Sequence, residues 1–202
     1  GIVDGQWIEF FQNGEKATQR EYSNGIPDGE WVTWHDKIFI KAQEMEYKDS
    51  LLVNDYSEWW ENGNKKIKGQ YMNNLKDGKW IFYNSDQTSR YSTSKTSKII
   101  FITDSEQLRS RYEFYDSGEL ISSYDFGYYD NGQLKEEPSF DDGIADGRWI
   151  EYFRDGEIAV QREYSNAIPD GDWISWDEDT HRKNQEMEYK DSLLVNDYSE
   201  WW

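Results

Sequence analysis

Short apolar stretches alternate with turn residues along most of the chain, and no window keeps a period of 3.6 residues. The stretches are five to eight residues long and rich in aromatic and β-branched side chains. In one of them, Ile158, Val160, Arg162 and Tyr164 alternate with other residues, a period of two that is typical of a half-buried strand. The pattern predicts consecutive antiparallel β-hairpins, with over about 40% of the residues in strands and little helix.

Turn signals separate these stretches. Asn-Gly and Asp-Gly pairs accept positive φ at little cost, so they favour two-residue type I′ hairpin turns. Aromatic residues precede such turns at Phe11, Trp60, Tyr115, Tyr129 and Phe153, and a second set of aromatic turns begins at Tyr22, Tyr71 and Phe140.

An Asp-Gly-x-Trp phrase opens successive units of the chain. It begins at Asp4, Asp28, Asp77, Asp146 and Asp170, and Val53–Tyr56 takes the same place with Tyr instead of Trp. The starts up to Asp77 step by 24, 25 and 24 residues. The predicted fold is therefore all-β: an elongated, open, solenoid-like array of consecutive antiparallel β-hairpin repeats of about 24 residues, each stabilised by its neighbours.

A longer duplication overlies this period. Residues 143–202 repeat residues 1–60 without a gap and with 18 differences, so we expect the two copies to adopt the same backbone. Seven of the eight positions in 35–42 differ from their counterparts in 177–184. This contrast predicts an exposed hairpin end, which either sets the choice of partner or is unconstrained.

We expect a single repeat array over residues 1–202. Regular repeats are predicted at 1–84 and 146–202, and irregular ones at 85–145, where a Ser/Thr-rich loop covers 85–98.

The chain stops in mid-pattern. Its second copy ends at Trp201-Trp202, whereas the first runs on from Trp60 into the turn at Gly63. We therefore expect a piece of a longer array, with self-association through its open ends.

Residues 4–25 (DGQWIEFFQNGEKATQREYSNG) resemble the bacterial variant of the MORN repeat, and the resemblance covers most of residues 4–84 and 146–202. It implies an open stack of antiparallel hairpins that serves as an interaction module. Bacterial members of the family are often labelled as antitoxin components, and some eukaryotic relatives bind lipids. The resemblance implies no catalytic residues.

The composition of the chain limits the classes of partner that we expect. The net charge of −19 opposes binding to nucleic acids and anionic lipids. No apolar run approaches the roughly 18–20 residues of a membrane helix, so we expect no membrane insertion. The 17% aromatic content supplies apolar area for a folded core. We expect a protein partner, in either a cytoplasmic or a cell-surface location.

Some aromatic residues are candidates for ligand contact. Trp7 and Phe10 are three residues apart, so either a bulge intervenes or both faces of the sheet carry aromatics, and we favour the second. The second aromatic of each unit then lines a partly exposed face. These candidates are Phe10, Trp34, Trp59, Tyr83, Tyr152 and Trp176. They serve protein binding, stack on glycan or choline ligands, or form the core of a thin repeat.

Catalytic, cofactor and metal sites are not expected. The two histidines are not kept in the duplication, since Asp177 replaces His35 and His181 replaces Phe39. No cysteine is present. The acidic turns at Asp28, Asp141, Asp142, Asp146 and Asp170 offer oxygen atoms to calcium, but turn chemistry explains them better. The function expected is a non-catalytic module for protein binding or scaffolding, with an antitoxin-like role as one form of it; the alternative is a cell-surface glycan- or choline-binding repeat.

Overall fold

The computed structural model describes residues 1–36, 38–85 and 108–199. Strands take up 65% of the described residues, and none of those residues lies in a helix. The prediction of an all-β fold of consecutive antiparallel hairpins in open sheets is confirmed. The chain forms two compact units, Gly1–Tyr124 and Asp125–Trp202, which are described in turn. Apart from Ser85, the predicted Ser/Thr-rich loop lies outside the described residues, as do Trp201 and Trp202.

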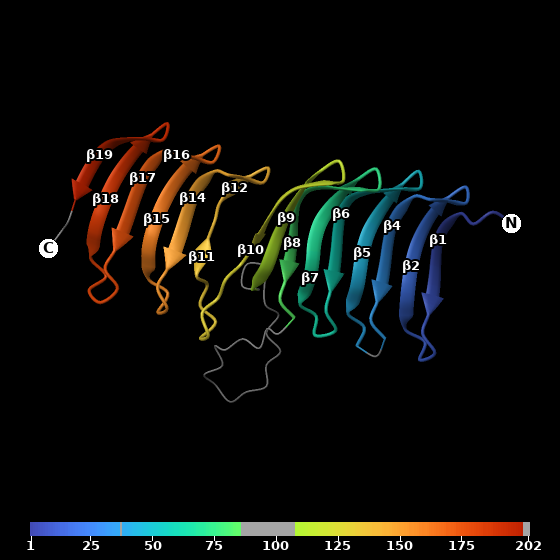
Figure 1. The fold of residues 1–202 in the computed structure, drawn as a ribbon. Helices are drawn as coiled ribbons and strands as arrows, with labels where there is room; N and C mark the ends of the chain where they lie inside the picture. The colour runs from blue at the N-terminus through green and yellow to red at the C-terminus, as the bar shows by residue number, and fades with distance from the viewer. Residues whose placement is uncertain (37, 86–107, 200–202) are drawn as a thin grey trace, which may run out of the picture. The chain divides into compact units, whose positions relative to one another are not determined.

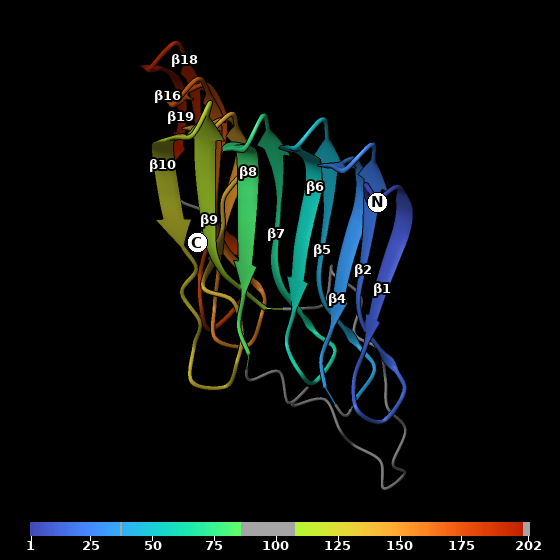
Figure 2. The same ribbon diagram turned by 90° about the vertical axis from the view of Figure 1, so that its right-hand side faces the viewer.

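The first unit is an open sheet in which the main strands follow their order in the chain, β1-β2-β4-β5-β6-β7-β8-β9-β10, while β3 pairs with β2 (Figures 1 and 2). The strands are β1 (Gly5–Phe10), β2 (Lys16–Ser23), β3 (Ile26–Pro27), β4 (Gly29–Trp34), β5 (Lys41–Lys48), β6 (Leu51–Trp59), β7 (Lys65–Met72), β8 (Leu75–Tyr83), β9 (Arg109–Asp116) and β10 (Glu119–Asp125).

The second unit repeats this plan in a sheet of order β11-β14-β15-β17-β18-β19, with β16 paired to β15 and a small β12-β13 hairpin. Its strands are β11 (Glu136–Glu137), β12 (Phe140–Asp141), β13 (Ile144–Ala145), β14 (Gly147–Tyr152), β15 (Ile158–Ser165), β16 (Ile168–Pro169), β17 (Gly171–Trp176), β18 (Lys183–Lys190) and β19 (Leu193–Ser199). The β14-β15 pair has the same register as β1-β2 at an offset of 142 residues, including its bulge.

Two kinds of turn join the strands. The short turns have positive φ at both central residues, as a type I′ turn requires; Asn24 and Gly25 have φ of 50° and 82°. The other short turns are Asp49-Ser50, Asn73-Asn74, Ser117-Gly118, Asp142-Gly143, Asn166-Ala167 and Asp191-Ser192.

The long turns correct the prediction of a type I′ turn at every Asn-Gly pair. In Phe11–Glu15 the Phe11 N–H donates to the Glu15 carbonyl (2.8 Å) and the Gly14 N–H donates to the Phe11 carbonyl (3.0 Å). Only the glycine has positive φ, while the Asn13 side chain accepts from the Glu15 N–H at 3.0 Å. Trp60–Asn64, Tyr129–Gln133 and Phe153–Glu157 share this pattern. The Asn13 side chain makes this hydrogen bond instead of adopting the left-handed conformation, so the loop is longer than a two-residue type I′ turn.

One face of each sheet carries a row of touching aromatic rings. We call it the ladder face, and it bears Trp7, Trp31, Tyr56 and Trp80 in the first unit and Trp149 and Trp173 in the second. Trp31 lies between Tyr22 (5.6 Å between ring centroids) and Tyr47 (4.6 Å). In the second unit Trp173 lies between Tyr164 (5.7 Å) and Tyr189 (4.7 Å). Trp31 and Trp173 are thus each flanked by rings on the two neighbouring strands.

Burial on the ladder face increases from the edge strand β1 toward β8. Trp7 is 48% exposed, Trp31 is half-buried, Tyr56 is 7% exposed and Trp80 is 1% exposed. A Cβ atom on Gly69 would lie 2.3 Å from the Trp80 ring, so only glycine lets the indole close over the backbone there. Trp7 is not part of the core, because the edge strand β1 has a neighbouring strand on one side alone.

Hydrogen bonds also join neighbouring hairpins at the short turns. The Asp4 carboxylate accepts from the Asn24 N–H at 2.9 Å, and Asp146 accepts from the Asn166 N–H at 3.0 Å. Asp28 and Asp170 accept instead from the Lys48 and Lys190 ammonium groups, both at 3.1 Å. The aspartate of the Asp-Gly-x-Trp phrase therefore connects one hairpin to the next, which is the turn chemistry that the sequence favoured over calcium.

The burial gradient predicts unequal effects of removing equivalent rings. Trp80→Ala should lower the free energy of unfolding by about 3–5 kcal/mol, and Trp7→Ala by less than about half of that, because Trp7 loses little buried area. Trp80→Phe should cost less than Trp80→Ala, since the indole N–H is buried without an acceptor in the described structure. Urea denaturation of the full chain measures all three, and equal losses for Trp7→Ala and Trp80→Ala would contradict the gradient.

The duplicated copies offer a test of turn strain. Ala167 has φ of 63°, where the first copy has Gly25. Ala167→Gly should raise the free energy of unfolding by about 0.5–1 kcal/mol, because the left-handed conformation costs an L-residue about 1–2 kcal/mol and the added flexibility of glycine offsets only part of that. Ala159→Gly, in strand β15, is the matched control and should be destabilising. A destabilised Ala167→Gly variant would refute the strain.

Candidate interaction surface

The face opposite the ladder carries the second aromatic of each unit. We call it the bulge face, and it bears Phe10, Trp34, Trp59 and Tyr83 in the first unit and Tyr152 and Trp176 in the second. Trp7 and Phe10 point to opposite sides because β1 is paired continuously from Gly5 to Phe10. The prediction that both faces carry aromatics is thus confirmed.

A β-bulge also occurs at every one of these residues, on the following strand. Opposite β1, strand β2 pairs Thr18 with Glu9 and then Lys16 with Phe10, so Ala17 is skipped. The skipped residue turns Lys16 to the side on which Phe10 lies. The same irregularity recurs beside Trp34, Trp59, Tyr83, Tyr152 and Trp176.

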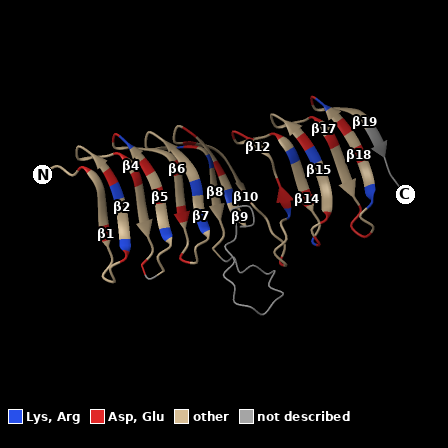
Figure 3. Ribbon diagram, turned by 180° about the vertical axis from the view of Figure 1, so that it is seen from behind, with Lys and Arg blue, Asp and Glu red and all other residues tan. Residues whose placement is uncertain are grey.

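The bulges place a basic residue opposite five of the six aromatics. The pairs are Phe10–Lys16, Trp34–Lys41, Trp59–Lys65, Tyr83–Arg109 and Trp176–Lys183, whereas Tyr152 faces Ile158. Figure 3 shows basic residues at the starts of β2, β5 and β7. Sequence reasoning missed these partners, although a basic residue six or seven positions after Phe10, Trp34 and Trp59 was a visible signal.

Cation–π contacts connect the basic residues and the aromatic residues on this face. The Lys65 ammonium lies 4.1 Å from the Trp59 ring centroid, and the Lys16 ammonium lies 5.9 Å from that of Trp34. Lys41 pairs with the Glu44 carboxylate. Beside the bulges this face therefore presents aromatic and cationic groups in alternation, whereas Glu30 and Glu44 lie further along the same face.

Exposure varies along the candidate residues. Phe10 is 60% exposed, and Trp34, Trp59, Tyr152 and Trp176 are half-buried. Tyr83 on β8 is only 5% exposed, and Tyr112 and Phe114 on the neighbouring strand β9 are also buried. The accessible part of the row therefore excludes Tyr83.

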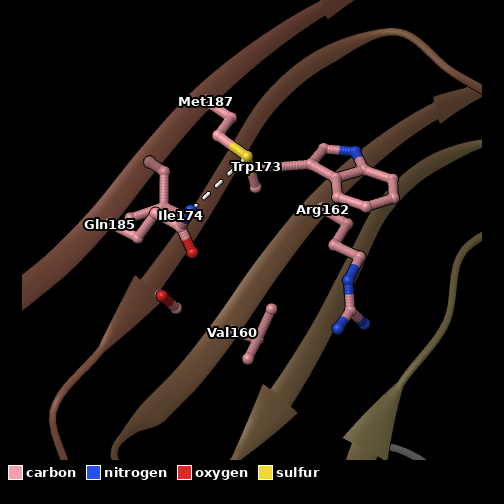
Figure 4. A pocket seen from close by; sticks show the side chains of 7 residues that line it. Val160, Arg162, Trp173, Ile174, Gln185 and Met187 are labelled. Carbon is pink, nitrogen blue, oxygen red and sulfur yellow. Dashed lines mark hydrogen bonds between the residues drawn. The ribbon is translucent and has the colours of Figure 1, made fainter. Parts of the chain in front are cut away.

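The ladder face of the second unit has a depression of about 210 Å³ beside Trp173 (Figure 4). Its lining includes Val160, Arg162 and Met187, and the Arg162 guanidinium lies 5.5 Å from the Trp173 ring centroid. The depression is mostly apolar, and a cation already lies beside its main ring.

Each of the two histidine rings has one polar partner. His35 Nε2 lies 2.8 Å from the Trp59 carbonyl oxygen, and His181 Nε2 lies 3.1 Å from Asp155. Within the described ranges, no three His, Cys, Asp or Glu residues are grouped so as to hold a metal ion. In the same ranges no helix is long and apolar enough to cross a membrane.

Comparison with known families decides the repeat type. The model of the MORN repeat variant matches residues 126–142 and 145–166, which contain the β14-β15 hairpin. Residues 126–166 therefore carry MORN-type repeats. Because β1-β2 duplicates β14-β15 in sequence and register, the MORN-type pattern extends to the first hairpin of the chain.

Other comparisons add little. A search of curated proteins found no match. Among solved structures, the crystal structures of TcdB2-TccC3 and TcdB2-TccC3-Cdc42 are 10% and 11% identical, each with a TM-score of 0.24. The matches cover 97% and 93% of this chain but only 13% and 12% of those chains. TM-scores this low support no inference.

The ladder face also contains tyrosines with shifted pKa values. Burial, together with the hydrogen bond that its hydroxyl donates to Glu113, raises the pKa of Tyr115 to about 12. Burial also raises the pKa of Tyr56, whose hydroxyl donates to Glu58 and accepts from Gln43.

These shifts predict a loss of stability in alkali. Unfolded tyrosines release protons near their ordinary pKa of 10, whereas folded Tyr115 keeps its proton up to about pH 12. The unfolded state then binds fewer protons, so the free energy of unfolding should fall as pH rises through this window. Urea denaturation at stepped pH measures the slope. A variant with Tyr56→Phe and Tyr115→Phe should have a shallower slope than the parent, and an unchanged slope would contradict the assignment.

Proposed function

We propose that this MORN-type repeat module is non-catalytic and binds a protein partner through its bulge face. Modules built from this repeat commonly bind proteins or membrane lipids. The observation that carries the proposal is the row of accessible aromatics, each beside a basic residue, at Phe10, Trp34 and Trp59. An antitoxin role, in which the partner is a toxin, is a narrower form of the same proposal.

The chemistry of the bulge face suits a protein surface. Aromatic and Arg or Lys side chains that are partly buried before binding lose little conformational entropy when a partner covers them. The row lies on alternate strands, so its members are about 9.6 Å apart. This spacing distributes the contacts over an extended surface rather than a single pocket.

A choline ligand is less well matched. A choline cage needs several aromatic faces around one cation, whereas the rings of this row are about 9.6 Å apart. The Lys65 ammonium, 4.1 Å from the Trp59 centroid, already takes the place that a choline group would occupy. Glycan binding through the exposed Phe10 ring is the second candidate.

Two substitutions in one strand test the proposal. Phe10→Ser and Trp7→Ser each remove an exposed ring from β1, but from opposite faces of the sheet. A tagged full chain is used to capture its partner from its native source, and the affinity of the identified protein is measured by calorimetry. Phe10→Ser should weaken binding about tenfold or more, as expected for an aromatic contact, while Trp7→Ser should leave binding unchanged.

The outcomes separate the candidates. Equal weakening by the two variants, or weakening by Trp7→Ser alone, would refute binding through the bulge face. Titration with choline chloride and with chitin oligosaccharides, repeated on Phe10→Ser, tests the alternative. Saturable binding of either ligand that Phe10→Ser abolishes would favour ligand recognition instead.

A further inference from the structure

Exposed aliphatic side chains lie at the end of each sheet where the short turns join the strands. Ile26, Leu51 and Leu75 each follow a short turn directly and are 45%, 39% and 47% exposed. The second unit has Ile144, Ile168 and Leu193 at the same place, with 46%, 44% and 70% exposure. We call these six residues the turn-edge row. Neither the ladder face nor the bulge face accounts for them.

Within the array, these side chains pack against a neighbour on one side only. Leu75 lies against the next short turn, where a Cβ atom added to Gly118 would be 3.1 Å from its Cδ2 atom. The other side remains exposed. Isolated exposed aliphatics are ordinary, but a row of them at one position of successive hairpins is an apolar stripe.

Acidic groups border the stripe. Asp49 lies in a short turn, while Asp116 precedes and Glu119 follows another. All three are exposed. These three carboxylates make no salt bridge within the described ranges, whereas the ammonium groups of Lys48 and Lys190 are paired with Asp28 and Asp170. The end of the sheet at the short turns therefore combines aliphatic contacts with exposed carboxylates.

We propose that the turn-edge row of each unit is a second docking surface, for a basic protein segment in polyproline II conformation with an aliphatic residue at every third position. Charge complementarity selects Lys and Arg between the aliphatic residues. The row follows the short turns of successive hairpins, so a segment that makes contact along one line fits it best.

Spacing sets the period of the segment. Ile26, Leu51 and Leu75 follow turns of successive hairpins, which are two strands or about 9.6 Å apart. Three residues of a polyproline II helix make one turn and span about 9.3 Å, so every third side chain points to the same side and meets the next aliphatic residue of the row. In a β-strand, side chains on one side recur every two residues, about 6.7 Å apart, and would lose register after one contact.

The test uses the full chain and a fluorescein-labelled peptide of five Leu-Lys-Lys repeats, with binding followed by anisotropy. The variant with Ile26→Ser, Leu51→Ser and Leu75→Ser should bind at least about tenfold more weakly, because three partly exposed aliphatic contacts are lost. Asp49→Asn with Glu119→Gln should also weaken binding, more at low salt than at high salt. Thermal melting confirms that the variants fold.

Matched controls decide the result. A peptide of the same composition with its leucines clustered at one end, and a peptide of Leu-Glu-Glu repeats, should bind at least about tenfold more weakly than Leu-Lys-Lys. Equal binding of either control, or no effect of the serine substitutions in a folded variant, would overturn the proposal. Binding of phosphatidylcholine–phosphatidylserine vesicles that needs Ile26, Leu51 and Leu75 would assign the row to lipid and also overturn it. Phe10→Ser should leave peptide binding unchanged, so this surface and the bulge face fail independently.

Discussion

A sheet without a second layer has to bury its apolar side chains against its own neighbours. In this protein the ladder face meets that constraint with rings that contact the hairpin before and the hairpin after, as Trp31 contacts Tyr22 and Tyr47. Burial depends on the number of neighbours, which is why Trp80 is 1% exposed and the equivalent Trp7 on the edge strand is 48% exposed. Stability is then the sum of contacts between adjacent repeats, as in other repeat proteins.

This constraint divides the molecule into surfaces with different roles. The ladder face is occupied by its own rings and by cations such as Arg20, whose guanidinium lies 5.3 Å from the Trp31 centroid. The bulges turn basic residues such as Lys16 and Lys65 to the other side, beside the remaining aromatics. The edge at the short turns holds the hairpins together through aspartates such as Asp4 and keeps aliphatic side chains exposed. The two surfaces that internal packing leaves accessible are those for which we propose partners.

Sequence reasoning succeeded where the pattern is local. The Asp-Gly-x-Trp phrase and the short turns predict hairpins, because positive φ and aromatic spacing are properties of a few adjacent residues. It failed where the outcome depends on neighbours. The exposure of Trp7 follows from its place on the edge strand, and the motif does not encode why Tyr83 is buried while Trp59 is half-buried. The bulges depend on pairing between strands, so Lys16 was not recognised as the partner of Phe10 although both were visible.

Native-state hydrogen exchange of the full chain, read for each backbone amide, tests most directly whether the hairpins depend on their neighbours. The account predicts that in the first unit the hydrogen-bonded amides of β7 and β8, around the buried Trp80, exchange most slowly, and that protection declines through β5 and β4 to β1. Uniform protection across β1 to β8, or the strongest protection at β1, would contradict it.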